Sequence, residues 1–92
     1  MEDKIEDETI ENKRKRLRYR SWHRGIKEMD IILGTFADKH IDSFDEVRLA
    51  QYDEIIRYSD PDLYNWITGR EEAPANVVND LFTMLINHKV VE

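Results

Sequence analysis

The sequence of 92 residues has no cysteine, only three glycines and two prolines, and no long apolar run. The absence of cysteine excludes a disulfide framework and thiolate chemistry, and it fits a reducing compartment. The apolar runs fall far short of the roughly 20 residues that span a membrane, so we expect no membrane insertion. The acidic N-terminus resembles neither a secretory signal nor an arginine-rich transit peptide. A chain of this length forms one small domain.

Charge is abundant and is divided into three blocks. Residues 1–12 carry a net charge of −5, residues 13–27 carry +8 without an acidic residue, and residues 28–92 carry −9. A basic block with interleaved aromatic residues is able to bind phosphates and stack on bases. The acidic character of the whole chain argues against a nucleic-acid partner. We therefore expect the basic block to attract the acidic flanks or a protein, and a small helical nucleic-acid-binding or antitoxin-like module is the alternative.

Apolar spacing predicts an all-α fold, a single-domain bundle of about five helices over residues 12–92. Residues 1–11 lack apolar periodicity and are predicted to be a disordered acidic tail. The first two helices are expected over residues 13–23 and 26–39. Gly25 separates them, because glycine readily takes the positive φ that often ends a helix.

Three further helices are predicted from their capping residues. Ser43 and Glu46 have the spacing of a capping box, so the third helix is expected to begin after Ser43 and to end near Tyr58. Asp60 is expected to cap the fourth helix, and Pro74 to open the fifth. The residues expected to face the core are Ile26, Met29, Leu33, Phe36, Leu49, Tyr52, Ile55, Ile56, Leu63, Trp66, Ile67, Val78, Leu81, Phe82, Met84, Leu85 and Ile86.

The usual constellations of catalytic residues are missing. The three glycines stand in unrelated contexts and form no phosphate-binding loop. His23, His40 and His88 lie far apart in sequence without a His-x3-His pair, and surface or helix-end positions are favoured over a zinc site that folding would bring together. Asp60 and Asp62 are better explained by capping and by the helix dipole than by a carboxylate pair. We expect no metal site, and we expect that this chain is not an enzyme.

Two segments carry a recognisable pattern. Residues 24–30 read Arg-Gly-Ile-Lys-Glu-Met-Asp, and residues 60–67, about thirty residues later, read Asp-Pro-Asp-Leu-Tyr-Asn-Trp-Ile. In this order and in a short acidic chain, they resemble the FAD assembly factor family of succinate dehydrogenase. Members of that family promote covalent flavin attachment to the flavoprotein subunit of the dehydrogenase. The resemblance extends over residues 16–86.

The resemblance implies a fold, a partner and a site. The family fold is a five-helix bundle, and its signature residues correspond to Arg24, Gly25 and Glu28. Its members bind the flavoprotein subunit and perform no chemistry themselves, so we expect FAD to be handled on the client and not to be bound stably here. The resemblance leaves open whether the related fumarate reductase is a client. We expect a monomer when free, in the bacterial cytoplasm, or in the mitochondrial matrix if the chain is a processed eukaryotic form.

The joint between the first two helices has properties that suit binding. Arg24 is able to form a bidentate pair with a carboxylate, and Gly25 allows close approach of a partner backbone. Glu28 is able to receive a partner arginine. In the alternative, Arg24 and Glu28 pair with each other and Gly25 only turns the chain. The contact surface is expected to include Lys27 as well as Tyr19, Trp22 and His23, and the last three are equally suited to the core of the first helix.

Overall fold

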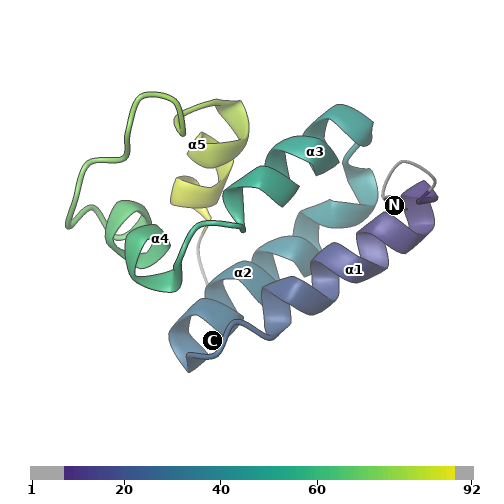
Figure 1. Cartoon of the computed structure of the whole chain (residues 1–92), viewed down its shortest axis with the longest axis horizontal. Coiled ribbons are helices and arrows are strands. Elements are labelled where there is room, and N and C mark those ends of the chain that lie inside the picture. Colours follow the sequence, from purple (N-terminus) through teal and green to yellow (C-terminus); the bar gives the residue numbers. More distant parts are fainter. Residues whose placement is uncertain (1–7, 89–92) are drawn as a thin grey trace, which may run out of the picture.

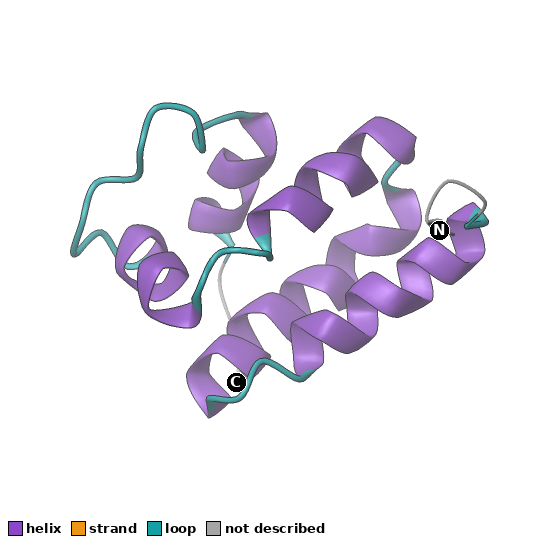
Figure 2. Cartoon of the chain, in the orientation of Figure 1, coloured by secondary structure: helices purple, strands orange, loops and turns teal. Residues whose placement is uncertain are grey.

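Five α-helices follow one another, and there is no strand in residues 8–88, which the computed structural model describes (Figures 1 and 2). The helices are α1 (Ile10–Trp22), α2 (Lys27–His40), α3 (Glu46–Ile55), α4 (Asp60–Ile67) and α5 (Asp80–Asn87), with a short 3-10 helix, η2 (Ile41–Ser43), after α2. The predicted all-α class with five helices is confirmed. Over the same residues, we find no helix with the length and apolar character needed to cross a membrane.

α1 and α2 form an antiparallel pair that lies along one side of the molecule (Figure 1). The indole of Trp22 lies directly over Gly34, so that a Cβ at position 34 would overlap with the ring. Leu17 of α1 and Leu33 of α2 are fully buried. The glycine in the middle of α2 therefore permits the close approach of a side chain from α1.

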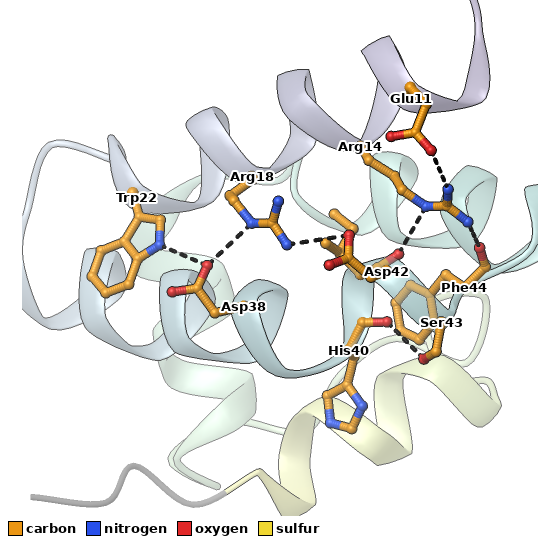
Figure 3. A network of polar contacts seen from close by, with 10 residues as sticks. Glu11, Arg14, Arg18, Trp22, Asp38, His40, Asp42, Ser43 and Phe44 are labelled. Carbon is orange, nitrogen blue, oxygen red and sulfur yellow. Dashed lines mark hydrogen bonds and ion pairs between the residues drawn. The ribbon is translucent and has the colours of Figure 1, made fainter.

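A polar network also joins these two helices (Figure 3). Arg18 Nε and Trp22 Nε1 both donate to Asp38 Oδ1, at 3.1 and 3.3 Å. Arg14 donates to the backbone carbonyl oxygens of Ile41 and Phe44, at 3.2 and 2.9 Å. Because these two carbonyls lie at and just after η2, the network fixes the chain reversal that leads into α3.

The core lies between the α1–α2 pair and the later helices. Its buried apolar residues are Leu17, Met29, Leu33, Phe36, Ala37, Ile41, Phe44, Leu49, Tyr52, Ile55, Ile56, Leu63, Trp66, Val77, Leu81, Phe82 and Leu85. Most of the predicted core residues are confirmed by this set. The predicted core positions are wrong for Ile26, Val78 and Ile86, which remain 44%, 52% and 40% exposed. Ile67 and Met84 are half-buried against the core.

The structure corrects the predicted end of the acidic tail. α1 begins at Ile10, and Thr9 caps it by accepting a hydrogen bond from the backbone N–H of Asn12 at 3.1 Å. Ile10 packs against the core, so the helix gains an apolar contact by including residues that the sequence predicts to lie in the tail. Residues 1–7 of that tail lie outside the described residues.

The predicted starts of the last three helices are also corrected. Asp45 caps α3 by accepting from the backbone N–H of Arg48 at 2.9 Å, whereas the hydroxyl of Ser43 donates back to the His40 carbonyl. Ser59 caps α4, and Asp60 is its first helical residue. α5 begins only after Asn79, whose side chain accepts from the N–H of Phe82 at 2.8 Å.

Pro74 therefore does not open the last helix. It begins a turn in which its carbonyl accepts a hydrogen bond from the N–H of Val77 at 2.9 Å. The side chain of Val77 is buried by this turn, and only 3% of the residue remains exposed. The segment between α4 and α5 is consequently a long loop that anchors itself in the core.

Candidate functional site

The bend between α1 and α2 depends on Gly25. Its φ of +113° lies in the left-handed region, which residues with a side chain rarely adopt. A Cβ built at this position has no neighbour within 4 Å, so the backbone of the bend faces open space. The glycine is therefore needed for the turn itself, and the space beside its Cα is open.

Arg24 points in the opposite direction, into the molecule. Its Nε donates to Asp60 Oδ1 at 2.9 Å, and its Nη1 and Nη2 donate to the carbonyl oxygens of Ile56 and Tyr58 at 2.7 and 3.0 Å. The side chain of Arg24 is only 9% exposed and that of Asp60 only 15%. All three guanidinium nitrogens are thus used within the protein, and the pair that Arg24 forms is with Asp60 and not with Glu28.

These bonds bring the two recognised segments together. Arg24 belongs to residues 24–30, and Asp60 belongs to residues 60–67, on α4. The backbone N–H of Arg24 in addition donates to the side chain of Asp30, which closes the bend onto the first turn of α2. Figure 1 shows that α4 lies beside the N-terminal end of α2. One arginine therefore fixes the bend relative to both neighbouring elements.

The outer side of the bend carries Glu28, the remaining residue of the signature, and Lys27, which is also expected on the contact surface. Lys27 and Glu28 are exposed in the first turn of α2, and among the described residues neither forms an ion pair or a side-chain hydrogen bond. Glu28 lines a shallow hollow of about 230 Å³ together with Ile26 and Tyr64. The hollow therefore combines apolar walls with one carboxylate, and it draws residues from both recognised segments.

The aromatic residues upstream of the bend divide into two kinds. Tyr19, which is 64% exposed, stacks on His23 with 4.0 Å between the ring centroids, and both lie on the surface. His23 Nδ1 lies 2.8 Å from the carbonyl oxygen of Tyr19. Trp22 is half-buried over Gly34 and belongs to the contact between the first two helices. Only Tyr19 and His23 are therefore placed as surface residues.

Among the described residues, four arginines of the basic block form ion pairs with carboxylates. The ion pairs are Arg14 with Glu11, Arg16 with Glu8 and Asp53, Arg18 with Asp38 and Asp42, and Arg24 with Asp60. The acidic flanks thus neutralise much of the positive charge. This arrangement agrees with the expectation that the block attracts the acidic parts of the chain, and it leaves fewer cations to bind phosphates.

Arg16 lowers the pKa values of its two carboxylate partners, Glu8 and Asp53. The hydrogen bond from Arg16 lowers the pKa of Glu8. Burial on its own would raise the pKa of Asp53, but the hydrogen bonds and charges of Arg16 and Arg57 outweigh burial and lower it. Both carboxylates are therefore held ionised as structural ligands of arginine, and neither is poised as a general acid.

A second hollow, of about 650 Å³, lies between α1, α3 and the residues that follow α3. It is lined by Lys13, Ala50, Asp53, Glu54, Arg57 and Tyr58. Its charges are mixed, and Asp53 is already committed to two arginines. Over residues 8–88, no group of three or more histidine and acidic side chains is placed to hold a metal ion.

The comparison with known proteins decides which family is involved. Residues 15–89 match the family model described as the flavinator of succinate dehydrogenase. This chain belongs to that family. The resemblance found in residues 24–30 and 60–67 is thereby confirmed, and these segments of the flavinator family meet in the structure through Arg24 and Asp60.

Relatives in this flavinator family are named as assembly factors. The chain is 37% identical over 84 residues to the mitochondrial succinate dehydrogenase assembly factor 2-A of Drosophila mojavensis, covering 89% of this chain and 54% of that protein. It is 36% identical over 79 residues to the mitochondrial succinate dehydrogenase assembly factor 2 of Dictyostelium discoideum, covering 86% and 56%. The chain spans about half the length of the curated relatives it matches.

Sequence reasoning missed two residues of the hollow and one role. The apolar spacing of α2 predicts Ile26 to lie in the core, and in the sequence Tyr64 stands out only as part of the pattern in residues 60–67. Asp60 was interpreted as a cap, although it is the partner of Arg24. The co-occurrence of the two recognised segments is the one signal in the sequence that points to this contact.

Proposed function

We propose that this chain binds the flavoprotein subunit of succinate dehydrogenase and promotes covalent attachment of FAD to it. Membership of the flavinator family supports this function. The observation that carries it is the meeting of the two recognised segments at one surface, with Arg24 buried against Asp60 beneath it and Gly25, Lys27 and Glu28 exposed above. Such a surface is preorganised for a partner protein, because its backbone is fixed before binding.

The chain acts by holding its client, without chemistry of its own. As the family resemblance implies, FAD held on the flavoprotein would supply the 8α carbon to which a histidine of that subunit becomes covalently attached. Binding that aligns this histidine with the flavin lowers the entropic part of the barrier. Fixing hydrogen-bond donors of the client near the flavin would also stabilise the negative charge that develops on the ring. The residues at the bend would supply the contacts that hold the client in place.

FAD remains on the client in this proposal. The hollow at the bend presents the carboxylate of Glu28, which would repel the pyrophosphate of a free dinucleotide. Tyr19 and His23 extend the contact surface beyond the bend, and Trp22 supports it from within. We further propose that the free chain is a monomer, in the bacterial cytoplasm or in the mitochondrial matrix, the latter matching the mitochondrial names of its relatives.

The experiment measures covalent flavin in the flavoprotein subunit. The purified subunit is incubated with FAD, alone or with this chain, and the flavin that survives denaturation is quantified by its fluorescence. The wild-type chain is expected to raise the covalent fraction, and Gly25→Arg to abolish the effect, because a long side chain would stand on the outer side of the bend.

Gly69→Arg is the matched control. Gly69 also has a positive φ, +82°, and open space around its Cβ, so the substitution introduces comparable backbone strain at the other end of α4. We expect this variant to retain activity. Equal flavin incorporation with and without the wild-type chain would reject the proposed function. Equal incorporation with wild type and Gly25→Arg would reject the bend as the site.

A further inference from the structure

Ile26 occupies a position that a capping residue would normally fill. It stands at the N-cap of α2 with an extended backbone, φ −126° and ψ 142°, and makes no capping hydrogen bond. The other four α-helices are each capped by a side chain, those of Thr9, Asp45, Ser59 and Asn79. Asn, Asp or Ser at position 26 would accept a hydrogen bond from the first turn of α2. The helix therefore begins without a stabilising contact that its backbone geometry would allow.

The side chain of Ile26 does not fill the core instead. Ile26 is 44% exposed, and it forms one wall of the hollow that Tyr64 and Glu28 complete. Its backbone is nevertheless well fixed, because Arg24 is bonded to the α3–α4 junction and Met29 is fully buried. An apolar side chain is thus held rigidly at the surface, where neither helix stability nor core packing requires it.

We propose that Ile26 is an anchor through which this chain binds its client, an inference that rests on the proposed function. The client segment that fits the hollow offers an apolar side chain to Ile26 and to the ring of Tyr64, with a lysine or arginine beside it. The charge follows from Glu28, whose carboxylate is exposed at the hollow and has no cationic partner among the described residues. An acidic segment would be repelled by the same carboxylate.

The geometry suits an interface anchor for two reasons. Residues that dominate binding energies lie in well-packed pockets, where they become fully desolvated on association. Little conformational entropy is lost when such a residue is already fixed before binding. Ile26 meets both conditions, because its exposed fraction is available for burial and the bend that carries it is clamped by Arg24.

The test separates binding from folding through one substitution. Ile26→Asn places a capping side chain on α2 and removes the apolar side chain from the hollow. We expect its melting temperature to equal or exceed that of wild type, while the dissociation constant for the flavoprotein subunit rises at least about tenfold, the scale of one buried aliphatic side chain. Ile26→Leu, which keeps the apolar surface, is expected to stay within about threefold of wild type.

Two further variants serve as controls for Ile26→Asn. Val47 is 66% exposed on α3, so Val47→Asn removes a comparable surface residue away from the bend, and we expect unchanged binding. If Ile26→Asn proves less stable than wild type, Ile26→Ser supplies the same comparison with a smaller capping side chain. If the folded Ile26→Asn or Ile26→Ser variant binds the flavoprotein subunit as tightly as wild type does, the proposal that Ile26 is an anchor is overturned.

The charge of the client segment is tested separately. Glu28→Lys is expected to weaken binding to the flavoprotein subunit more than Glu28→Gln does. Added NaCl should weaken binding by the wild-type chain more than binding by Glu28→Gln. Equal binding by Glu28→Lys and wild type would contradict the prediction that the client segment carries a lysine or arginine.

If the wild-type chain does not bind the flavoprotein subunit, the proposed function fails. If wild type binds and the folded Ile26→Asn variant binds equally well, only the anchor inference fails.

Discussion

At the scale of single residues, the behaviour of Arg24 is explained by where its hydrogen bonds go. A nearly buried guanidinium is stable only when its donors are satisfied, and Asp60 with two backbone carbonyls satisfies all three nitrogens. Sequence reasoning treated Arg24 as a residue that contacts the partner. The structure gives it a supporting position beneath the bend, so that its loss would affect the partner surface through the shape of the bend.

Replacement of Arg24 is therefore predicted to destabilise the fold. Arg24→Ala leaves the carboxylate of Asp60 and the two carbonyls without their donor, and we expect the free energy of unfolding to fall by about 3 kcal/mol. Urea denaturation measures this change. Arg20→Ala, on the exposed side of α1, is the control and should alter stability by less than about 0.5 kcal/mol. Similar stabilities for the two variants would contradict the stabilising role of the hydrogen bonds that Arg24 donates.

Gly34 gives a second prediction at the residue scale. Alanine usually favours a helix by about 1 kcal/mol relative to glycine. Here the added Cβ would overlap with the indole of Trp22, so Gly34→Ala is expected to lower stability by about 1–3 kcal/mol. In a Trp22→Ala background the same change should become neutral or stabilising, and thermal unfolding of the four proteins measures the coupling. Independent, additive effects would show that the indole does not restrict position 34.

At the scale of elements, apolar periodicity predicts the helices well and their ends poorly. The predicted second helix, 26–39, closely matches α2, because its apolar residues repeat on one face and become buried. The fifth was predicted from Pro74 but begins at Asp80, because Val77 is buried by a turn that a helix would not form. Caps depend on which of several neighbouring polar side chains reaches a free N–H, and that is decided by tertiary contacts.

The start of α3 tests this point directly. Asp45 accepts from the N–H of Arg48, whereas the hydroxyl of Ser43 is directed back to His40. We expect Asp45→Ala to lower the free energy of unfolding by about 1 kcal/mol and Ser43→Ala to have a clearly smaller effect. Chemical denaturation of both variants provides the comparison. A larger effect of Ser43→Ala would restore the capping box with Glu46 that the sequence suggested.

The candidate site was only partly predictable for the same reason. The segment 24–30 and the exposed Gly25 and Glu28 follow from the sequence pattern. The inward direction of Arg24 does not, because its partners lie more than thirty residues away and two of them are backbone carbonyls, which leave no mark in the sequence. The exposure of Ile26 was likewise hidden, since its spacing is that of a core residue.

At the scale of the whole molecule, a pair of histidines links the C-terminal end of α5 to α2. The hydroxyl of Thr35 donates to the carbonyl of Ile31, so His88 Nε2 must donate to Thr35 Oγ1, at 2.8 Å. His88 Nδ1 is then a buried acceptor without a partner in the described residues. The rings of His40 and His88 lie 6.5 Å apart between their centroids. This arrangement favours neutral histidines.

Stability is therefore predicted to decrease on mild acidification. Burial, with the nearby charge of Lys39, lowers the pKa of His40, and burial, with His40 and Lys39, lowers the pKa of His88. The unfolded chain then binds more protons than the native protein below about pH 6.5, so the free energy of unfolding falls as the pH decreases from about 7 to 5. Urea denaturation at several pH values across this interval measures how steeply the free energy of unfolding depends on pH.

Glutamine variants identify the histidines as the cause. His40→Gln and His88→Gln should each reduce the dependence of stability on pH in this interval, since the titrating group is removed. The measurement stays above pH 5, because Glu8 and Asp53 have lowered pKa values and begin to lose their stabilising ion pairs at lower pH. A slope that is unchanged in both variants would exclude the histidine pair as its source.

The most direct test is to locate the client on this chain by hydrogen exchange. Amide exchange is compared with and without the flavoprotein subunit of succinate dehydrogenase. We predict the strongest protection in residues 24–30 and around Tyr64 of α4, with little change on the outer face of α3 at Glu46, Ala50 and Glu54. Protection confined to the hollow between α1 and α3, with the bend unaffected, would contradict the proposed binding surface.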